Sequence, residues 1–165
     1  MSANRKPFRV LFVCMGNICR SPAAEIVCKK MLGESDLADS VELDSAGTIG
    51  YHTGNGPDPR MAATLKARGY PVFGRARQIT AGDLDDFNLI LVADEENLAD
   101  VRRLDRDGSR SAKIRLLVEY CETHDAPRVP DPYYGGQRGF EEVADLMEDA
   151  CGGLLRNLER GVRES

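Results

Sequence analysis

The sequence lacks a long hydrophobic run and has few of the residues that bind metal ions. No apolar stretch approaches the roughly 18 residues that a membrane span requires. The apolar run Val10–Cys14 follows Arg9 and leads into no small-residue cleavage site, so it is a poor signal peptide. There are only two histidines, His52 and His124, and no pair of cysteines has zinc-finger spacing. We therefore expect a cytoplasmic protein with no metal, cofactor or membrane partner, although secretion without a signal peptide stays open.

Basic residues are in the minority, because 22 Lys and Arg stand against 27 Asp and Glu, a net charge of -5. This balance excludes a general nucleic-acid binder, which needs a basic face, so any positive field for a phosphate must be local. The cysteines are odd in number, which in a cytosolic protein indicates free thiols, at least one of which can be used in chemistry. The five are Cys14, Cys19, Cys28, Cys121 and Cys151.

No internal repeat, low-complexity tract or inter-domain linker interrupts the chain. Its 165 residues, 42% hydrophobic and 30% charged, are typical of a globular protein. A chain of this length buries roughly 70% of the surface that its unfolded form exposes, so it can fold without disulfides or a structural metal. We predict a single domain over residues 1–165, with a core from about residue 7 to about residue 163.

Strand-like and helix-like patterns alternate along the sequence, which predicts an α/β fold with a parallel sheet covered on both faces. The predicted strands are Phe8–Cys14, Val41–Asp44, Asn88–Ala93 and the more ambiguous Lys113–Val118. The predicted helices are Pro22–Leu32, Asp58–Gly69, Asp94–Leu104 and a long amphipathic helix whose apolar stripe runs from Phe140 to Val162. Two segments without periodicity, Ala46–Pro57 and His124–Gly139, are predicted to be loops that are either functional or disordered. The second is rich in Pro, Gly and Tyr, a composition that disfavours disorder.

The segment Cys14–Pro22 carries the strongest chemical signal. Cys14 ends a hydrophobic strand, and Ser21 followed by Pro22 favours a helix start. A tight loop between strand and helix turns successive backbone N–H groups inward as an anion site. Arg20 would add a planar fork for two phosphate oxygens. In such surroundings Cys14 is expected to be a thiolate nucleophile that faces a bound phosphoryl group.

Val13–Pro22 resembles the signature loop of the low molecular weight protein-tyrosine phosphatases. The resemblance extends over four further blocks at family-like spacing, which are Asp44–Thr48, Pro57–Arg60, Ala93–Glu95 and Asp131–Tyr134. It implies a four-stranded parallel sheet flanked by helices on both faces. It also implies hydrolysis of phosphotyrosine in proteins without a metal, with inorganic phosphate as the product.

The resemblance assigns roles to the residues of the loop. The cysteine that matches Cys14 attacks phosphorus and forms a phosphocysteine, and the arginine that matches Arg20 clamps the phosphoryl oxygens. The serine that matches Ser21 bonds the sulfur, and the asparagine that matches Asn17 is tied to the counterpart of Ser45. Ser21 could instead be only a helix cap, and Ser45 only a turn residue. The phosphate-binding residues implied are Met15, Gly16, Asn17, Ile18, Cys19 and Arg20.

Hydrolysis of a phosphate ester also requires an acid that protonates the departing oxygen. Asp131 matches the family's proton donor, and it lies between Pro130 and Pro132, whose fixed φ angles stiffen the chain. Without the resemblance, Asp131 would be interpreted as a turn residue, since Asp-Pro is common in turns.

Three tyrosines, Tyr51, Tyr133 and Tyr134, lie in the two aperiodic segments. Tyr51 and Tyr133 match positions that form the aromatic walls of the family's substrate slot, although many relatives have Trp where this chain has Tyr51. Such walls would stack on a phosphotyrosine ring and keep a short phosphoserine from reaching the thiolate. Tyr134 is assigned to the same pocket, with a loop-covering role as its alternative.

Other residues are less decisive. By resemblance, Cys19 can form a protective disulfide with Cys14. Cys28 and Cys151 are expected to pack as hydrophobes. Asp94 either supports the rim of the site or caps the next helix, and we favour the cap.

Three alternative functions remain at this point. An arsenate reductase needs a resolving cysteine pair near residues 80–92, and Thr80–Val92 has no cysteine. A protein-arginine phosphatase typically has Thr at the position of Ile18, so Ile18 favours the tyrosine branch. The third alternative is a phosphotyrosine-binding module that has lost catalysis. The presence of Cys14, Arg20 and Asp131 together argues against it. We expect the protein to be a monomer or a weak dimer.

Overall fold

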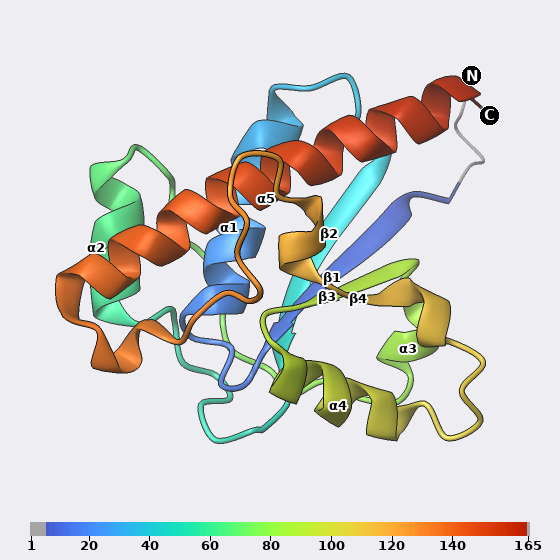
Figure 1. Cartoon of the computed structure of the whole chain (residues 1–165), viewed down its shortest axis with the longest axis horizontal. Coiled ribbons are helices and arrows are strands. Elements are labelled where there is room, and N and C mark those ends of the chain that lie inside the picture. Colours follow the sequence, from blue (N-terminus) through green and yellow to red (C-terminus); the bar gives the residue numbers. More distant parts are fainter. Residues whose placement is uncertain (1–5, 165) are drawn as a thin grey trace.

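The computed structural model describes residues 6–164, apart from the side chains of Tyr134 and of residues 162–164. Strands and helices alternate along the chain (Figure 1). The strands are β1 (Phe8–Cys14), β2 (Val41–Gly47), β3 (Leu89–Val92) and β4 (Ile114–Leu116). The helices are α1 (Arg20–Gly33), α2 (Pro59–Ala67), α3 (Asp83–Asp86), α4 (Glu95–Leu104) and α5 (Gly136–Glu164). Short 3-10 helices are η1 (Ser111–Lys113), η2 (Leu117–Tyr120) and η3 (Pro132–Tyr134).

The four strands form one parallel sheet in the order β2-β1-β3-β4. Val10 of β1 lies opposite Leu43 of β2 on one side and Leu89 of β3 on the other. The predicted α/β fold with a four-stranded parallel sheet is therefore confirmed. All four strands end at the same edge of the sheet, which is where open α/β sheets bind ligands.

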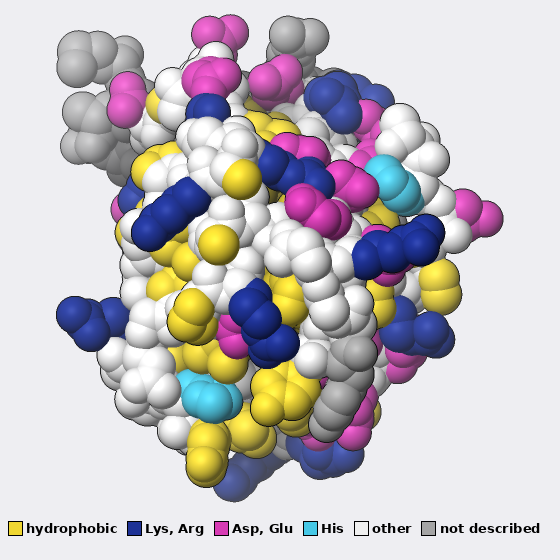
Figure 2. All heavy atoms as spheres, turned by 90° about the vertical axis from the view of Figure 1, so that its left-hand side faces the viewer, with side chains coloured by type: hydrophobic (Ala, Val, Ile, Leu, Met, Phe, Trp, Pro, Cys, Tyr) yellow, Lys and Arg dark blue, Asp and Glu magenta, His cyan; other side chains and the backbone are white. Residues whose placement is uncertain are grey.

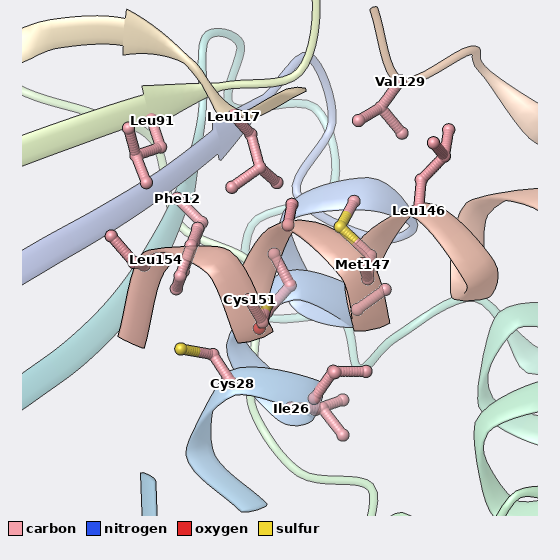
Figure 3. Packing of buried hydrophobic residues seen from close by; sticks show 14 of the residues in the cluster. Phe12, Ile26, Cys28, Leu91, Leu117, Val129, Leu146, Met147, Cys151 and Leu154 are labelled. Atoms are coloured by element: carbon pink, nitrogen blue, oxygen red, sulfur yellow. The ribbon is translucent and has the colours of Figure 1, made fainter. Parts of the chain in front are cut away.

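Helices cover both faces of this sheet, as predicted. Helices α1 and α5 lie against one face, whereas α3 and α4 lie on the other, with α2 beside α5 (Figure 1). On the first face, Cys28 of α1 and Cys151 of α5 both lie within the core (Figure 3), where the Cys151 thiol donates to the Ala24 carbonyl oxygen at 3.5 Å. Both are fully buried, and burial raises the pKa of Cys151. They pack as the hydrophobes that the sequence predicts. No helix among residues 6–164 is long and apolar enough to cross a membrane.

The largest differences from the predicted boundaries concern β2, β4 and α5. β2 continues to Gly47, so the predicted strand end at Asp44 and the predicted loop start at Ala46 are wrong. β4 is only three residues long, because the Glu119 carboxylate accepts the N–H of Leu116 and turns the chain into η2. Helix α5 begins at Gly136, so the prediction of a loop up to Gly139 is wrong. The first turn of α5 is glycine-rich and polar, and thus shows no apolar period. The apolar stripe from Phe140 is confirmed up to residue 158, and the side chain of residue 162 lies outside the described residues.

Helix α5 passes very close to η2 at Gly153. A Cβ atom on Gly153 would lie 1.8 Å from the carbonyl oxygen of Tyr120, so only glycine fits without a backbone shift. We predict that Gly153→Ala lowers the free energy of unfolding by about 3 kcal/mol or more. In the same helix, Gly161 is exposed and has no atom within 4 Å of its Cβ position.

Gly161→Ala is therefore the matched control, and we expect it to stabilise the protein by about 0.5–1 kcal/mol. Urea unfolding of both variants, followed by circular dichroism, measures the difference. Equal stabilities for the two alanine variants would contradict this packing.

Candidate active site

The phosphate-loop candidate, residues 15–19, connects the end of β1 to the start of α1 at the carboxyl edge of the sheet. Asn17 has φ 57°, the only positive φ of a non-glycine residue in the described part of the chain. Among the described residues, no hydrogen-bond partner is found for the backbone N–H groups of residues 15–20. A curled run of unpaired N–H groups that leads into a helix N-terminus forms an anion site.

Cys14 lies at the base of this loop and is 3% exposed. Its Sγ lies 3.0 Å from the Ser21 hydroxyl oxygen and accepts the Ser21 N–H at 3.4 Å. Helix α1 begins at Arg20, with Cys19 at its N-cap and no side-chain capping bond. The alternative that Ser21 acts as a helix cap is therefore wrong. Its hydroxyl group faces the sulfur instead.

Asn17 holds the loop in place through all of its side-chain polar atoms. Its Nδ2 donates to the hydroxyl groups of Ser21 at 2.8 Å and Ser45 at 3.0 Å, and its Oδ1 accepts the N–H of Arg77 at 2.9 Å. Ser45 in turn donates to Glu25 at 2.7 Å. The contact between Asn17 and Ser45 is thus present, and Ser45 is more than a turn residue. These contacts compensate for the strained backbone at Asn17.

Sequence reasoning missed Glu25 and Arg77. Arg77 lies far from the loop in the chain, and the role of Glu25 depends on Ser45, which is 20 residues away. Burial raises the pKa of Glu25, while the Ser45 hydroxyl group lowers it. The guanidinium of Arg77 joins Asp44 at 3.0 Å and Asp83 at 2.9 Å, which fixes the backbone N–H that Asn17 accepts. Both residues act on the loop only through other side chains.

Gly47 was also not singled out, although the loop depends on its lack of a side chain. A Cβ atom on Gly47 would lie 2.7 Å from the Met15 carbonyl oxygen and 3.1 Å from the Asn17 nitrogen. The end of β2 therefore allows the loop backbone to approach closely.

Arg20 lies under the loop and is 4% exposed. Its Nη1 donates to Asp94 at 2.7 Å and to the Val129 carbonyl at 3.1 Å. Burial lowers the pKa of this guanidinium. The charges of Cys14 and Asp94 have the opposite and larger combined effect, so the pKa is raised on balance. Asp94 also accepts the Asn97 N–H at 2.8 Å, so the predicted helix cap is confirmed and the support of the site is present as well.

Asp131 lies at the exposed end of the segment that carries Val129. The segment is fixed to the sheet because Val129 is fully buried and donates its N–H to Ala93 at 2.8 Å. The Asp131 Oδ1 accepts the Tyr133 N–H at 3.0 Å, which caps η3.

Cys19 is buried between these groups. Burial raises its pKa to about 12, and the charges of Asp58, Cys14 and Asp131 add to the effect. Cys19 is a free thiol in this structure.

The predicted aromatic positions lie on the rim. Tyr51 is 83% exposed and its ring meets that of His52 edge-on, with centroids 4.9 Å apart. The His52 ring in turn lies against Gly16 of the loop. Tyr133 is 56% exposed, and the side chain of Tyr134 lies outside the described residues. Met15 is exposed in the loop, whereas Ile18 is half-buried against the core.

Within residues 6–164 no group of three or more His, Cys, Asp or Glu side chains is arranged to hold a metal ion. The site therefore consists of a thiol, an arginine, a carboxyl group and a cradle of N–H groups. This set can bind a dianion and attack it.

Comparison with known proteins agrees with this geometry. The model of the low molecular weight phosphotyrosine protein phosphatase family matches residues 9–164. The chain belongs to this family. A low molecular weight protein-tyrosine-phosphatase of Streptomyces coelicolor is 44% identical, over 94% of this chain and 96% of its own length. Members of the low molecular weight phosphatase family are phosphoric monoester hydrolases, so the chain is an enzyme of that class.

Solved structures of low molecular weight phosphatases share the fold. The crystal structure of a protein tyrosine phosphatase from Entamoeba histolytica, with Hepes in its active site, has a TM-score of 0.88 and 44% identity. It covers 93% of this chain and 98% of its own. A Drosophila arginine phosphatase has a TM-score of 0.82 and 32% identity, over 90% of this chain and 96% of its own. The low molecular weight fold thus supports both substrate classes.

Proposed function

We propose that this phosphatase hydrolyses phosphotyrosine in proteins by way of a phosphocysteine on Cys14. The observation that supports the proposal is the cradle around the sulfur. Unpaired N–H groups of residues 15–20 and the buried Arg20 surround one thiol at the edge of the sheet. Such a cradle binds the phosphoryl oxygens and stabilises the charge that develops on them in the transition state.

In the first step the Cys14 thiolate attacks phosphorus, and the bond from phosphorus to the tyrosine oxygen breaks with its electron pair on oxygen. Asp131, in its protonated form, gives its proton to that oxygen, so tyrosine leaves as a neutral phenol. Ser21 orients its hydroxyl group toward the sulfur at 3.0 Å, which stabilises the thiolate before attack and again when it leaves.

In the second step a water molecule attacks the phosphocysteine. Asp131, now ionised, takes the proton from that water, the bond between sulfur and phosphorus breaks, and inorganic phosphate leaves. Arg20, held by Asp94, clamps the equatorial oxygens in both steps. The contacts of Asn17 with Ser45 and Ser21 keep the N–H groups aimed at the phosphate.

Tyr51 and Tyr133 would form the walls of the substrate slot. Both rings are exposed at the mouth, where they can contact the ring of a phosphotyrosine. Cys14 is 3% exposed at the base of the loop, so a phosphate on a long aromatic side chain reaches it more easily than one on serine.

The alternatives are less well supported. Thr80–Val92 forms α3 and β3 and contains no cysteine, so the resolving thiols of an arsenate reductase are missing from it. The structural similarity to an arginine phosphatase keeps phosphoarginine as a second candidate substrate. Ile18, at a position where arginine phosphatases typically have Thr, favours phosphotyrosine over phosphoarginine as the substrate.

Single-turnover assays on three peptides that differ only in phosphotyrosine, phosphoserine or phosphoarginine distinguish these substrates. We predict that phosphotyrosine is hydrolysed at least about 100-fold faster than phosphoserine, since a short side chain cannot bring its phosphate to the cradle. Faster release from phosphoarginine than from phosphotyrosine would contradict the proposed substrate class.

A further inference from the structure

Exposed apolar side chains gather at the mouth of the candidate site. In the described part of the chain, four of the five exposed large hydrophobic residues lie there, namely Met15, Ile49, Tyr51 and Tyr133. Met15 and Ile49 are joined by a backbone hydrogen bond of 3.1 Å. Exposed apolar groups next to a site indicate a surface that a partner covers. The partner here is the substrate that carries the phosphate.

Arg60 places a cation beside this apolar mouth. Its Cζ lies 5.3 Å from the centroid of the Tyr133 ring and 4.8 Å from that of the Phe140 ring. The side chain is 48% exposed. Two aromatic rings orient a guanidinium without neutralising its charge.

Arg60 also lies close to the phosphate loop. The N–H of Asp58 donates to the Ile18 carbonyl of the loop at 2.8 Å, two residues before Arg60. Burial has the largest effect on the pKa of Cys19, and the charge of Arg60 acts against it. The backbone contact between Asp58 and Ile18 and the ring contact with Tyr133 therefore place Arg60 beside the mouth of the candidate site.

The charge of Arg60 is only weakly compensated within the protein. In the described part of the chain its ion-pair partner is Asp58, with Nε 3.4 Å from Oδ1 and Nη2 donating to Oδ2 at 3.5 Å, both long contacts. That Oδ1 already accepts the backbone N–H groups of Arg60 at 2.8 Å and Met61 at 3.4 Å, because Asp58 caps α2. A guanidinium has five N–H donors, so Arg60 keeps donors for a further carboxylate.

We propose that Arg60 binds the carboxylate of an acidic residue next to the phosphotyrosine, and so selects acidic phosphotyrosine sequences. This inference rests on the proposed function. The net charge of -5 disfavours the binding of acidic peptides to most of the protein surface. An exposed cation beside the site is therefore needed to attract an acidic peptide there. Figure 2 shows cationic and hydrophobic side chains side by side near the middle of the face that it presents.

The test compares kcat/KM for two phosphotyrosine peptides that differ only in glutamate or glutamine on both sides of the phosphotyrosine. We expect the wild-type enzyme to prefer the glutamate peptide by about 2- to 5-fold at low salt, since one partly exposed ion pair has about that effect. High salt should reduce this ratio. Arg60→Gln should bring the ratio to about 1.

Arg115→Gln is the matched control. Arg115 is similarly exposed, at 52%, pairs with Glu119 at 3.2 Å and lies on β4 away from the loop. The Arg115→Gln substitution removes one positive charge, as Arg60→Gln does, and should leave the ratio of the two kcat/KM values unchanged.

The outcomes separate the inference from the proposed function. A residue that only supports Tyr133 would lower kcat/KM for both peptides equally. An unchanged ratio in Arg60→Gln, or no preference in the wild-type enzyme, would therefore overturn the inference while the proposed function stands. If the wild-type enzyme hydrolyses neither peptide, the proposed function itself fails.

Discussion

Replacing Cys14 by serine should lower the turnover of p-nitrophenyl phosphate by more than about 10⁴-fold while the fold stays intact. The Cys14 sulfur lies at the base of the cradle, where it is the proposed nucleophile, and it is 3% exposed. A serine hydroxyl group fits the same space. Because no base activates it, the hydroxyl group is a far weaker nucleophile than a thiolate. Steady-state release of p-nitrophenol measures the effect.

Cys121→Ser is the matched control, because Cys121 is a half-buried free thiol near α5, outside the loop. It should leave turnover within about twofold of the wild type, as expected away from the reacting atoms. Activity that survives in Cys14→Ser would contradict covalent catalysis at this position. Loss of activity in both variants would indicate a general requirement for thiols.

Replacing Asp131 by asparagine should slow turnover by roughly 10²–10⁴-fold, the usual contribution of a general acid. The amide oxygen of asparagine can still accept the Tyr133 N–H, a contact of 3.0 Å in the native chain, so η3 should keep its cap. The amide cannot protonate the leaving oxygen. The loss should therefore be larger for phenyl phosphate, whose leaving group needs the proton, than for p-nitrophenyl phosphate.

Asp125→Asn removes the same charge from the same loop, and Asp125 is exposed. We expect turnover within about twofold of the wild type for this control. Equal losses on the two aryl phosphates in Asp131→Asn would contradict the role of Asp131 as acid.

Much of the fold could be predicted from local patterns. The strand Phe8–Cys14 is confirmed residue for residue, because a continuous β-branched and aromatic run is typical of a central buried strand. The start of α5 was not predicted because its first turn is glycine-rich and polar and so shows no apolar period. β4 was predicted too long because the return bond from Glu119 to Leu116 has no periodic signature.

From local patterns alone the candidate site could be predicted only in the segment from Cys14 to Ser21, and Ser45 and Asp131 were assigned only by resemblance to the family. The loop, Ser21 and Arg20 lie in one segment, and the structure places them around Cys14. The contacts of Arg20 with Asp94 and of Asn17 with Arg77 span 74 and 60 residues. Pairs this far apart in the chain depend on the register of the sheet, which composition and spacing do not determine.

The catalytic roles depend on one covalent step, in which a phosphoryl group passes to sulfur. Rapid mixing with p-nitrophenyl phosphate, quenching in denaturant and mass spectrometry of the proteolysed protein test that step directly. The fragment after Arg9 and up to Arg20 contains both Cys14 and Cys19, so fragment ions must distinguish the two thiols. We predict a mass gain of about 80 daltons, one PO3H unit, on Cys14. An adduct on Cys19, or no adduct during turnover, would contradict it.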